Sequence, residues 1–220
     1  MAFASITASA KAGKDFDPVP AGVHFAICTQ VVDLGLQPGS GKFPKPKHQV
    51  YLKFEIPDVQ VSWVKDGKDH TGNATIGRKF GLSLSDKSHL KPFLVSWRGK
   101  PFTPTELESF DITSVIGKVC QLNVVHEDKR ADGGKIYAKI TNAFPLVREQ
   151  MAALKANPAR AKPSQDLLVY TPSAHDQAMW DRLPEWMQKA IDDRADRYAP
   201  ESESQAPATG TEDFNDDIPF

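Results

Sequence analysis

The sequence holds few of the residues that carry chemistry or cross-links. Its 220 residues include only two cysteines, Cys28 and Cys120, and neither belongs to a Cys-x-x-Cys motif. Each lies in a strand-like apolar run, so we expect reduced thiols in a core. The six histidines are scattered without metal-ligand spacing, and no nucleophile or metalloprotease motif occurs. We therefore expect no catalysis, no cofactor and no metal, and a nuclease or other enzyme is kept only as an alternative.

Long apolar runs are also missing. None approaches the length of a membrane span. The first ten residues lack a basic leader and a continuous hydrophobic stretch, so no secretory signal is expected. These absences predict a cytoplasmic protein that does not contact a membrane.

Positive charge is scarce in the last quarter of the chain. Residues 166–220 hold 4 Lys+Arg against 13 Asp+Glu, whereas residues 1–165 hold 23 against 15. The formal net charge of -1 therefore conceals a basic body joined to an acidic end. This division indicates a polyanion-binding domain with a tail of opposite sign.

Alternating apolar and polar residues predict a mainly β body with helical insertions. The ranges with this alternation are 22–32, 50–64, 74–84, 119–126 and 135–140. Between the third and fourth ranges, Leu90, Phe93, Leu94 and Trp97 have helical spacing after a cap at Ser85 or Asp86. Thr103, Pro104 and Glu106 follow with the pattern of a capping box.

Five strands with a helix before the fourth are typical of the oligonucleotide/oligosaccharide-binding (OB) fold, a five-stranded Greek-key barrel. Closure into a barrel removes exposed strand edges. An immunoglobulin-like sandwich is the rival, but the helical insert and the lack of a Cys-Trp-Cys pattern count against it. We therefore predict an OB-fold.

The chain divides into four expected parts. They are a flexible lead-in over 1–20, an OB-fold domain that binds single-stranded DNA over 21–147, a helical extension over 148–199 and a disordered acidic tail over 200–220. In the extension, an apolar stripe from Trp180 to Ile191 is interrupted by Pro184, which predicts two short helices. The stripe is expected to pack on the barrel or on a second subunit, so a homo-oligomer stays open.

Basic and aromatic residues gather on the expected loops and on the outward face of the expected strands. An OB barrel binds across its second and third strands and the loops that join strands one to two and four to five. Lysines and arginines there would contact phosphates, and rings would stack on bases. Trp63, Phe80 and Trp97 are instead expected in the core. The residues predicted to bind DNA are Lys42, Phe43, Lys45, Lys47, Tyr51, Lys53, Arg78, Lys79, Lys129, Arg130, Lys135, Tyr137 and Lys139.

The last ten residues, 211–220, combine four acidic side chains with a closing Ile-Pro-Phe. An apolar plug beside acidic groups suits a small hydrophobic pocket rimmed by Lys or Arg on another protein. This stretch resembles the C-terminal tip of bacterial single-stranded DNA-binding proteins (SSBs). Together with the strand order and the stretch over 74–97, it resembles phage-type SSBs. The resemblance implies that replication and repair proteins are recruited by Asp216, Asp217, Ile218, Pro219 and Phe220.

These features together predict a non-catalytic protein that coats and protects single-stranded DNA in replication, recombination and repair. If the chain is encoded by a bacteriophage, it would work in the cytoplasm of the bacterial host. The alternative is an OB-fold adaptor that binds replication proteins without touching nucleic acid. The sequence pattern does not distinguish DNA from RNA.

Overall fold

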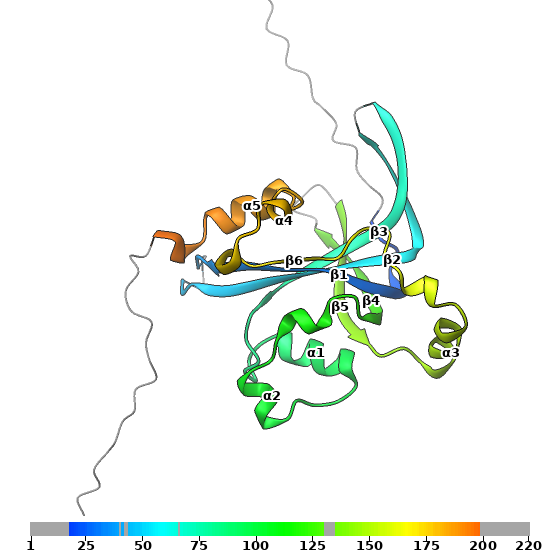
Figure 1. Ribbon diagram of the computed structural model, residues 1–220, viewed down its shortest axis with the longest axis horizontal. Coiled ribbons are helices and arrows are strands. Elements are labelled where there is room, and N and C mark those ends of the chain that lie inside the picture. Colours follow the sequence, from blue (N-terminus) through cyan, green and yellow to red (C-terminus); the bar gives the residue numbers. More distant parts are fainter. Residues whose placement is uncertain (1–17, 40, 42–43, 66, 130–134, 199–220) are drawn as a thin grey trace, which may run out of the picture.

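Five long antiparallel strands dominate the computed structural model, which describes residues 18–39, 41, 44–65, 67–129 and 135–198. Their order in the sheet is β3-β2-β1-β4-β5, and a short sixth strand, β6, pairs in parallel with β1 (Figure 1). The chain is therefore mainly β, as the alternation predicts. The strands are β1 (Gly22–Gln37), β2 (Lys47–Lys65), β3 (Lys68–Gly81), β4 (Val119–Lys129), β5 (Lys135–Phe144) and β6 (Leu168–Tyr170).

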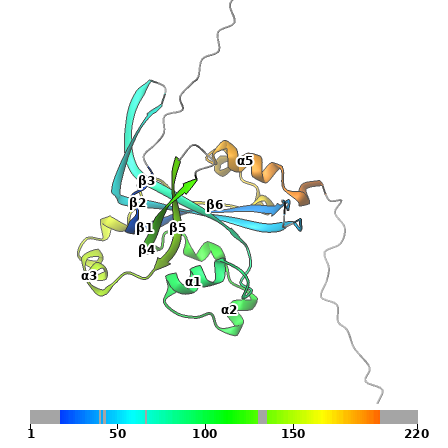
Figure 2. The same ribbon diagram turned by 180° about the vertical axis from the view of Figure 1, so that it is seen from behind.

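Short helices cover both sides of this sheet. The first group, between β3 and β4, is α1 (Leu90–Arg98), α2 (Pro104–Glu108) and the 3-10 turn η1 (Ile112–Val115). The second group, after β5, is α3 (Arg148–Ala156), η3 (Pro158–Ala161), η4 (Pro172–Ala174), α4 (Gln177–Trp180), α5 (Glu185–Asp192) and η5 (Ala195–Tyr198). Helices α1 and α2 lie on one side of the sheet, and α4 and α5 lie on the other (Figures 1 and 2). Among the described residues, no helix is both long and apolar enough to span a bilayer.

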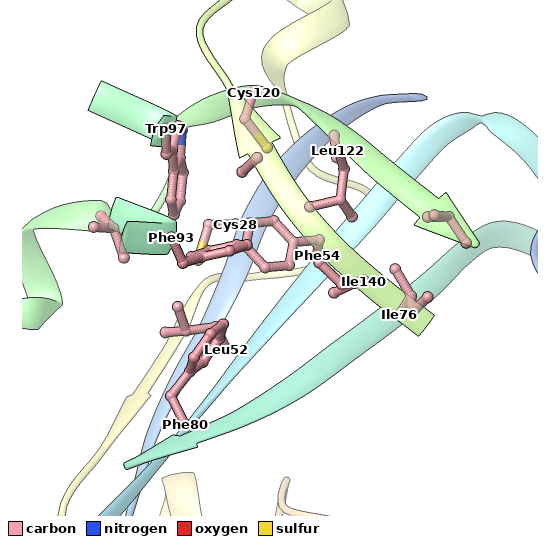
Figure 3. Packing of buried hydrophobic residues seen from close by; sticks show 14 of the residues in the cluster. Cys28, Leu52, Phe54, Ile76, Phe80, Phe93, Trp97, Cys120, Leu122 and Ile140 are labelled. Atoms are coloured by element: carbon pink, nitrogen blue, oxygen red, sulfur yellow. The ribbon is translucent and has the colours of Figure 1, made fainter. Parts of the chain in front are cut away.

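The main core lies between the sheet and α1 (Figure 3). Alternate residues of β2 are buried, which confirms the expected period of two: Val50, Leu52, Phe54 and Ile56. The expected face of α1 is buried too, and the ring of Phe54 contacts the rings of Phe93 and Trp97. The indole nitrogen of Trp97 donates a hydrogen bond to the carbonyl of Val119, 3.0 Å away. This bond fixes α1 to the start of β4.

Both cysteines lie in this core as free thiols, as expected. Cys28 belongs to β1 and Cys120 to the neighbouring strand β4. Burial raises the pKa of the Cys28 thiol to about 12 and raises the pKa of Cys120 well above its ordinary value. The two thiols therefore stay neutral and serve as small apolar side chains.

The sheet is open, because β3 and β5 form its two ends and share no strand ladder among the described residues. Arg78 of β3 spans this gap. Its Nη1 atom donates hydrogen bonds to the carbonyls of Ile140 (3.1 Å) and Thr141 (2.9 Å) on β5. Its guanidinium also lies over the ring of Phe80, 4.7 Å from the centroid. Arg78, which is among the residues predicted to bind DNA, thus joins the two edge strands.

A second cluster packs the C-terminal segment against the opposite face of the sheet. Its buried members are Val32, Leu34, Leu168, Tyr170, Leu183, Met187 and Ile191. The apolar stripe does form two short helices on either side of Pro184, and both pack on the sheet. Strand β6 was not expected, because three residues are too few for a periodic signal. It brings residues 168–170 of the C-terminal segment into the same sheet as β1.

Polar contacts also tie this segment to the sheet. The carboxylate of Glu55, which is 2% exposed, accepts hydrogen bonds from the backbone N–H of Ser164 (3.0 Å) and from its hydroxyl (2.9 Å). The side chain of Gln37 donates to the carbonyl of Ala190 at 2.9 Å. A buried carboxylate needs such donors. The segment therefore supplies hydrogen bonds that the buried Glu55 of β2 requires, besides covering the sheet.

The helix starts are partly as expected. Thr103 and Glu106 form the predicted capping box at α2. Helix α1, however, begins after His89, whose side chain makes no cap bond. The hydroxyl of Ser88 accepts a hydrogen bond from the backbone N–H of Lys91 (3.2 Å), and the side chain of Lys91 forms an ion pair with Asp86 (2.6 Å). Helix α4 is capped by Asp176.

Candidate nucleic-acid interface

The outer face of β2 and β3 carries three of the residues predicted to bind DNA. Strand register places Tyr51 opposite Lys79 and Lys53 opposite Gly77. Lys79 is exposed, whereas Tyr51 and Lys53 are half-buried. Burial lowers the pKa of Lys53, and the neighbouring carboxylate of Glu55 partly offsets this. The alternation in the sequence thus brings a ring and two amines onto one surface, as expected.

Helix α5 adds a ring to this face that the sequence did not assign to it. The ring of Trp186 lies 5.2 Å from that of Tyr51 in an edge-on arrangement. The ammonium of Lys79 lies 4.7 Å from the centroid of the Trp186 ring. Trp186 remains 43% exposed. An indole that is held at its edge and against a cation, yet open to solvent, is suited to stacking on a base.

A spacing signal could have separated Trp186 from the core of the apolar stripe. Leu183, Met187 and Ile191 recur at intervals of four and are buried. Trp186 is one position out of this spacing, which turns it about 100° around the helix. The prediction that the whole stripe packs on the barrel or on a second subunit did not separate the exposed Trp186 from the buried residues.

Tyr51 is positioned by a glycine on the neighbouring strand. A Cβ atom placed on Gly77 would lie 2.0 Å from the hydroxyl oxygen of Tyr51, so the phenol occupies the space that any larger residue would need. Burial raises the pKa of Tyr51 to about 12. Tyr51 therefore packs against Trp186 from the side of the sheet, and Trp186 is the more solvent-exposed ring of the pair.

The loop between β1 and β2 adds positive charge near this face. Lys45 and Lys47 are exposed, and Lys47 pairs with Gln37 at the end of the β1–β2 ladder. Beside them, His48 contacts the carboxylate of Asp33 at 2.6 Å. Lys42 and Phe43 lie outside the described residues.

The β4–β5 hairpin carries both signs of charge. Tyr137 is 39% exposed and lies opposite Glu127. Lys139 is exposed and forms an ion pair with Glu127 at 3.3 Å. Lys129 and Lys135 pair at the end of the ladder. Arg130 lies outside the described residues, as do the five residues of the expected tip, Asp216, Asp217, Ile218, Pro219 and Phe220.

The β2–β3 hairpin continues beyond the bulge at 56–60 as a two-stranded ribbon that projects from the body (Figures 1 and 2). Trp63, expected in the core, lies on this ribbon instead. Its ring is stacked on that of His70, with centroids 5.7 Å apart and an interplanar angle of 14°. A two-stranded ribbon has no second layer to bury a ring. In the sequence, the Asp-Gly pair at 66–67 is typical of a hairpin turn, and it follows so closely after Trp63 that it indicated a ring near a hairpin end.

The part of the chain that the structure describes lacks a cluster of metal-ligating side chains. No group of three or more His, Cys, Asp or Glu side chains there is arranged to hold a metal ion.

No protein-family model, curated protein or solved structure matches this chain. Its function must therefore be inferred from its own geometry.

Proposed function

We propose that this protein binds single-stranded DNA without catalysis, and that it coats and protects unpaired strands during replication, recombination and repair. One observation carries the proposal: on the outer face of β2 and β3, Lys79 lies against the half-exposed ring of Trp186 beside Tyr51. A cation for phosphate and a ring for a base are the two elements of non-specific strand binding.

We also propose that the sheet is a variant of the OB-fold. The spatial order β4-β1-β2-β3 is that of a Greek key. Arg78 links β3 to β5 at the position where a five-stranded barrel would close. OB-folds bind oligonucleotides across their second and third strands, and this is the surface that holds Lys53, Lys79 and Tyr51.

The closing residues support a second part of the function. On their resemblance to the tip of bacterial SSBs, we propose that Asp216 to Phe220 recruit replication and repair proteins. The 22 residues from 199 to 220 contain six acidic and no basic side chains. A segment of this composition favours pockets with basic rims over the DNA backbone.

The test is a binding measurement on the full-length chain. We would measure the fluorescence anisotropy of a labelled oligo-thymidine at low and at moderate salt. The affinity of the natural chain should fall steeply as salt rises, because phosphate contacts release counterions. Trp186→Ala should weaken binding by about 5- to 150-fold, the equivalent of about 1–3 kcal/mol for one stacked base. Lys79→Gln should weaken binding and flatten the salt dependence.

Lys91→Gln is the matched control for Lys79→Gln. Lys91 is on α1, on the other side of the sheet, where it pairs with Asp86. That variant should bind DNA like the natural chain. A weak, salt-insensitive signal, or equal losses in the Lys79 and Lys91 variants, would end the proposal. Duplex DNA and RNA measured in parallel would give the nucleic-acid preference.

The second candidate is an adaptor that binds replication proteins without nucleic acid. One observation favours it: Trp186 of α5 already covers part of the face, where its ring lies against that of the half-buried Tyr51. An adaptor should show no DNA binding at low salt in any variant, while still capturing partner proteins through its closing residues.

A further inference from the structure

An apolar pocket with a basic rim lies beside α1, the helix on the opposite side of the sheet from α5 (Figure 1). Its volume is about 280 Å³. The wall is mostly apolar, and two cations complete it. The wall residues are Leu94, Trp97, Phe110 and Val115, and the cations are Arg98 and Lys118.

The guanidinium of Arg98 is held in place by neighbouring groups, but not all of its hydrogen-bond donors have an acceptor. Its guanidinium lies 4.3 Å from the ring centroid of Phe102 and 5.6 Å from that of Phe110, and Nη2 bonds to the carboxylate of Glu106. The other terminal nitrogen, Nη1, is buried and has no hydrogen-bond partner among the described residues. A buried guanidinium donor without an acceptor is unfavourable. Nη1 is closed to solvent, so an oxygen acceptor from an occupant of the pocket would reach it only after the Arg98 side chain turns toward the pocket.

We propose that this pocket binds the closing segment of this same chain, Asp216 to Phe220. Ile218 and Phe220 are large enough to fill an apolar pocket of this size, and the two aspartates match the rim cations. Charge complementarity favours this occupant, because residues 199–220 carry six acidic groups and no basic one. An apolar ligand without charge would offer no acceptor to Lys118 or to Nη1 of Arg98, whose Nη2 is already paired with Glu106.

The chain between the body and this segment is long enough. Seventeen residues separate Tyr198 from Asp216, and they span up to about 55–60 Å when extended. A compact body of this size has a radius of gyration of about 16 Å and is therefore about 40 Å across. The segment can thus reach any face. Because a short tether gives an effective concentration in the millimolar range, even a modest site would be occupied.

The consequence is that the tip is masked on its own body until a partner protein competes for it. This inference does not depend on DNA binding, because α1, which lines the pocket, and α5, which contacts the outer face of β2 and β3, lie on opposite sides of the sheet (Figures 1 and 2). Failure of either proposal would leave the other standing.

The first experiment compares amide chemical shifts of the full-length chain with those of a full-length Ile218→Ala/Phe220→Ala variant. Besides the tail itself, residues 94–98 and 110–118 should shift, because they surround the pocket. Shifts confined to the tail, or shifts on β2 and β3 around Lys79, would overturn the proposal.

The second experiment uses a labelled peptide with the sequence of residues 210–220. It is added to the full-length Ile218→Ala/Phe220→Ala protein, whose own tip can no longer compete. Adding Lys118→Glu to that protein should weaken peptide binding at least about fivefold, since it reverses a rim charge. Lys155→Glu, which reverses an exposed charge on α3, is the matched control and should change nothing. Equal binding to the two charge variants would contradict the proposal.

Discussion

At the scale of single residues, we expect one added methyl group at Gly77 to destabilise the fold. The phenol of Tyr51 fills its space and is held there by Trp186. We expect Gly77→Ala to lower the free energy of unfolding by about 1–3 kcal/mol through overpacking, as measured by urea denaturation. Gly81→Ala, on the same strand with open space around it, should change stability by less than about 0.5 kcal/mol. Equal losses would show that strand propensity, not the Tyr51 contact, is responsible.

The thiols give a second prediction at this scale. Because burial raises the pKa of Cys28 to about 12 and holds that of Cys120 well above its ordinary value, neither should react with a disulfide reagent at pH 8 in the folded protein. Both should react once the chain is unfolded in urea. Raised pKa values in the folded state also mean that stability is full below the unfolded value of about 8.5 and declines as the pH rises above it. Rapid reaction of one thiol before unfolding would contradict their burial.

At the scale of elements, the start of α2 should respond to acid. The backbone N–H of Thr103, and then the guanidinium of Arg98, hold the pKa of Glu106 below its ordinary value. A depressed pKa contributes stability above the unfolded value of about 4.3, and this is lost as the pH falls through the folded value. Glu106→Gln should therefore show a shallower loss of stability between about pH 5 and pH 3, measured by urea midpoints. Glu108→Gln, in the same helix, should keep the natural slope.

Because Trp63 lies on the ribbon formed by β2 and β3 and Trp97 lies in the core, we expect the two tryptophans to contribute very differently to the free energy of unfolding. Trp97 is buried against Phe54 and bonded to β4, so Trp97→Ala should cost about 3–5 kcal/mol. Trp63 lies outside the core on the ribbon. Trp63→Ala should therefore cost less than about 1 kcal/mol. Similar losses in thermal or urea unfolding would mean that the ribbon is part of the cooperative core.

At the scale of the whole molecule, Arg78 should decide how firmly the open sheet holds its ends together. Arg78→Met keeps the apolar stem and removes the hydrogen bonds to Ile140 and Thr141. We expect a loss of about 1–3 kcal/mol and faster hydrogen exchange along β3 and β5, with β1 unchanged. Unchanged exchange at both edges would mean that packing alone holds the ends.

Local pattern was enough to predict much of the fold. The alternation in β2 foretold which residues face the core, the spacing from Leu90 to Trp97 foretold the buried face of α1, and Thr103 with Glu106 foretold a helix start. The same alternation placed Tyr51, Lys53 and Lys79 on one outward surface. These features depend on neighbours within a few residues, so the sequence alone determines them.

Contacts between distant segments were decided only by the tertiary structure. Alternation could not reveal that Arg78 would reach carbonyls about 60 residues away, or that Trp186 would lie over Lys79. Strand β6 exists because Leu168 to Tyr170 meet the edge of β1. Which segments meet is set by the packing of the whole chain, and many pairings satisfy the same local pattern. For that reason the sequence determined the ring and charges of the candidate face, and the tertiary structure decided which of them remain open to a ligand.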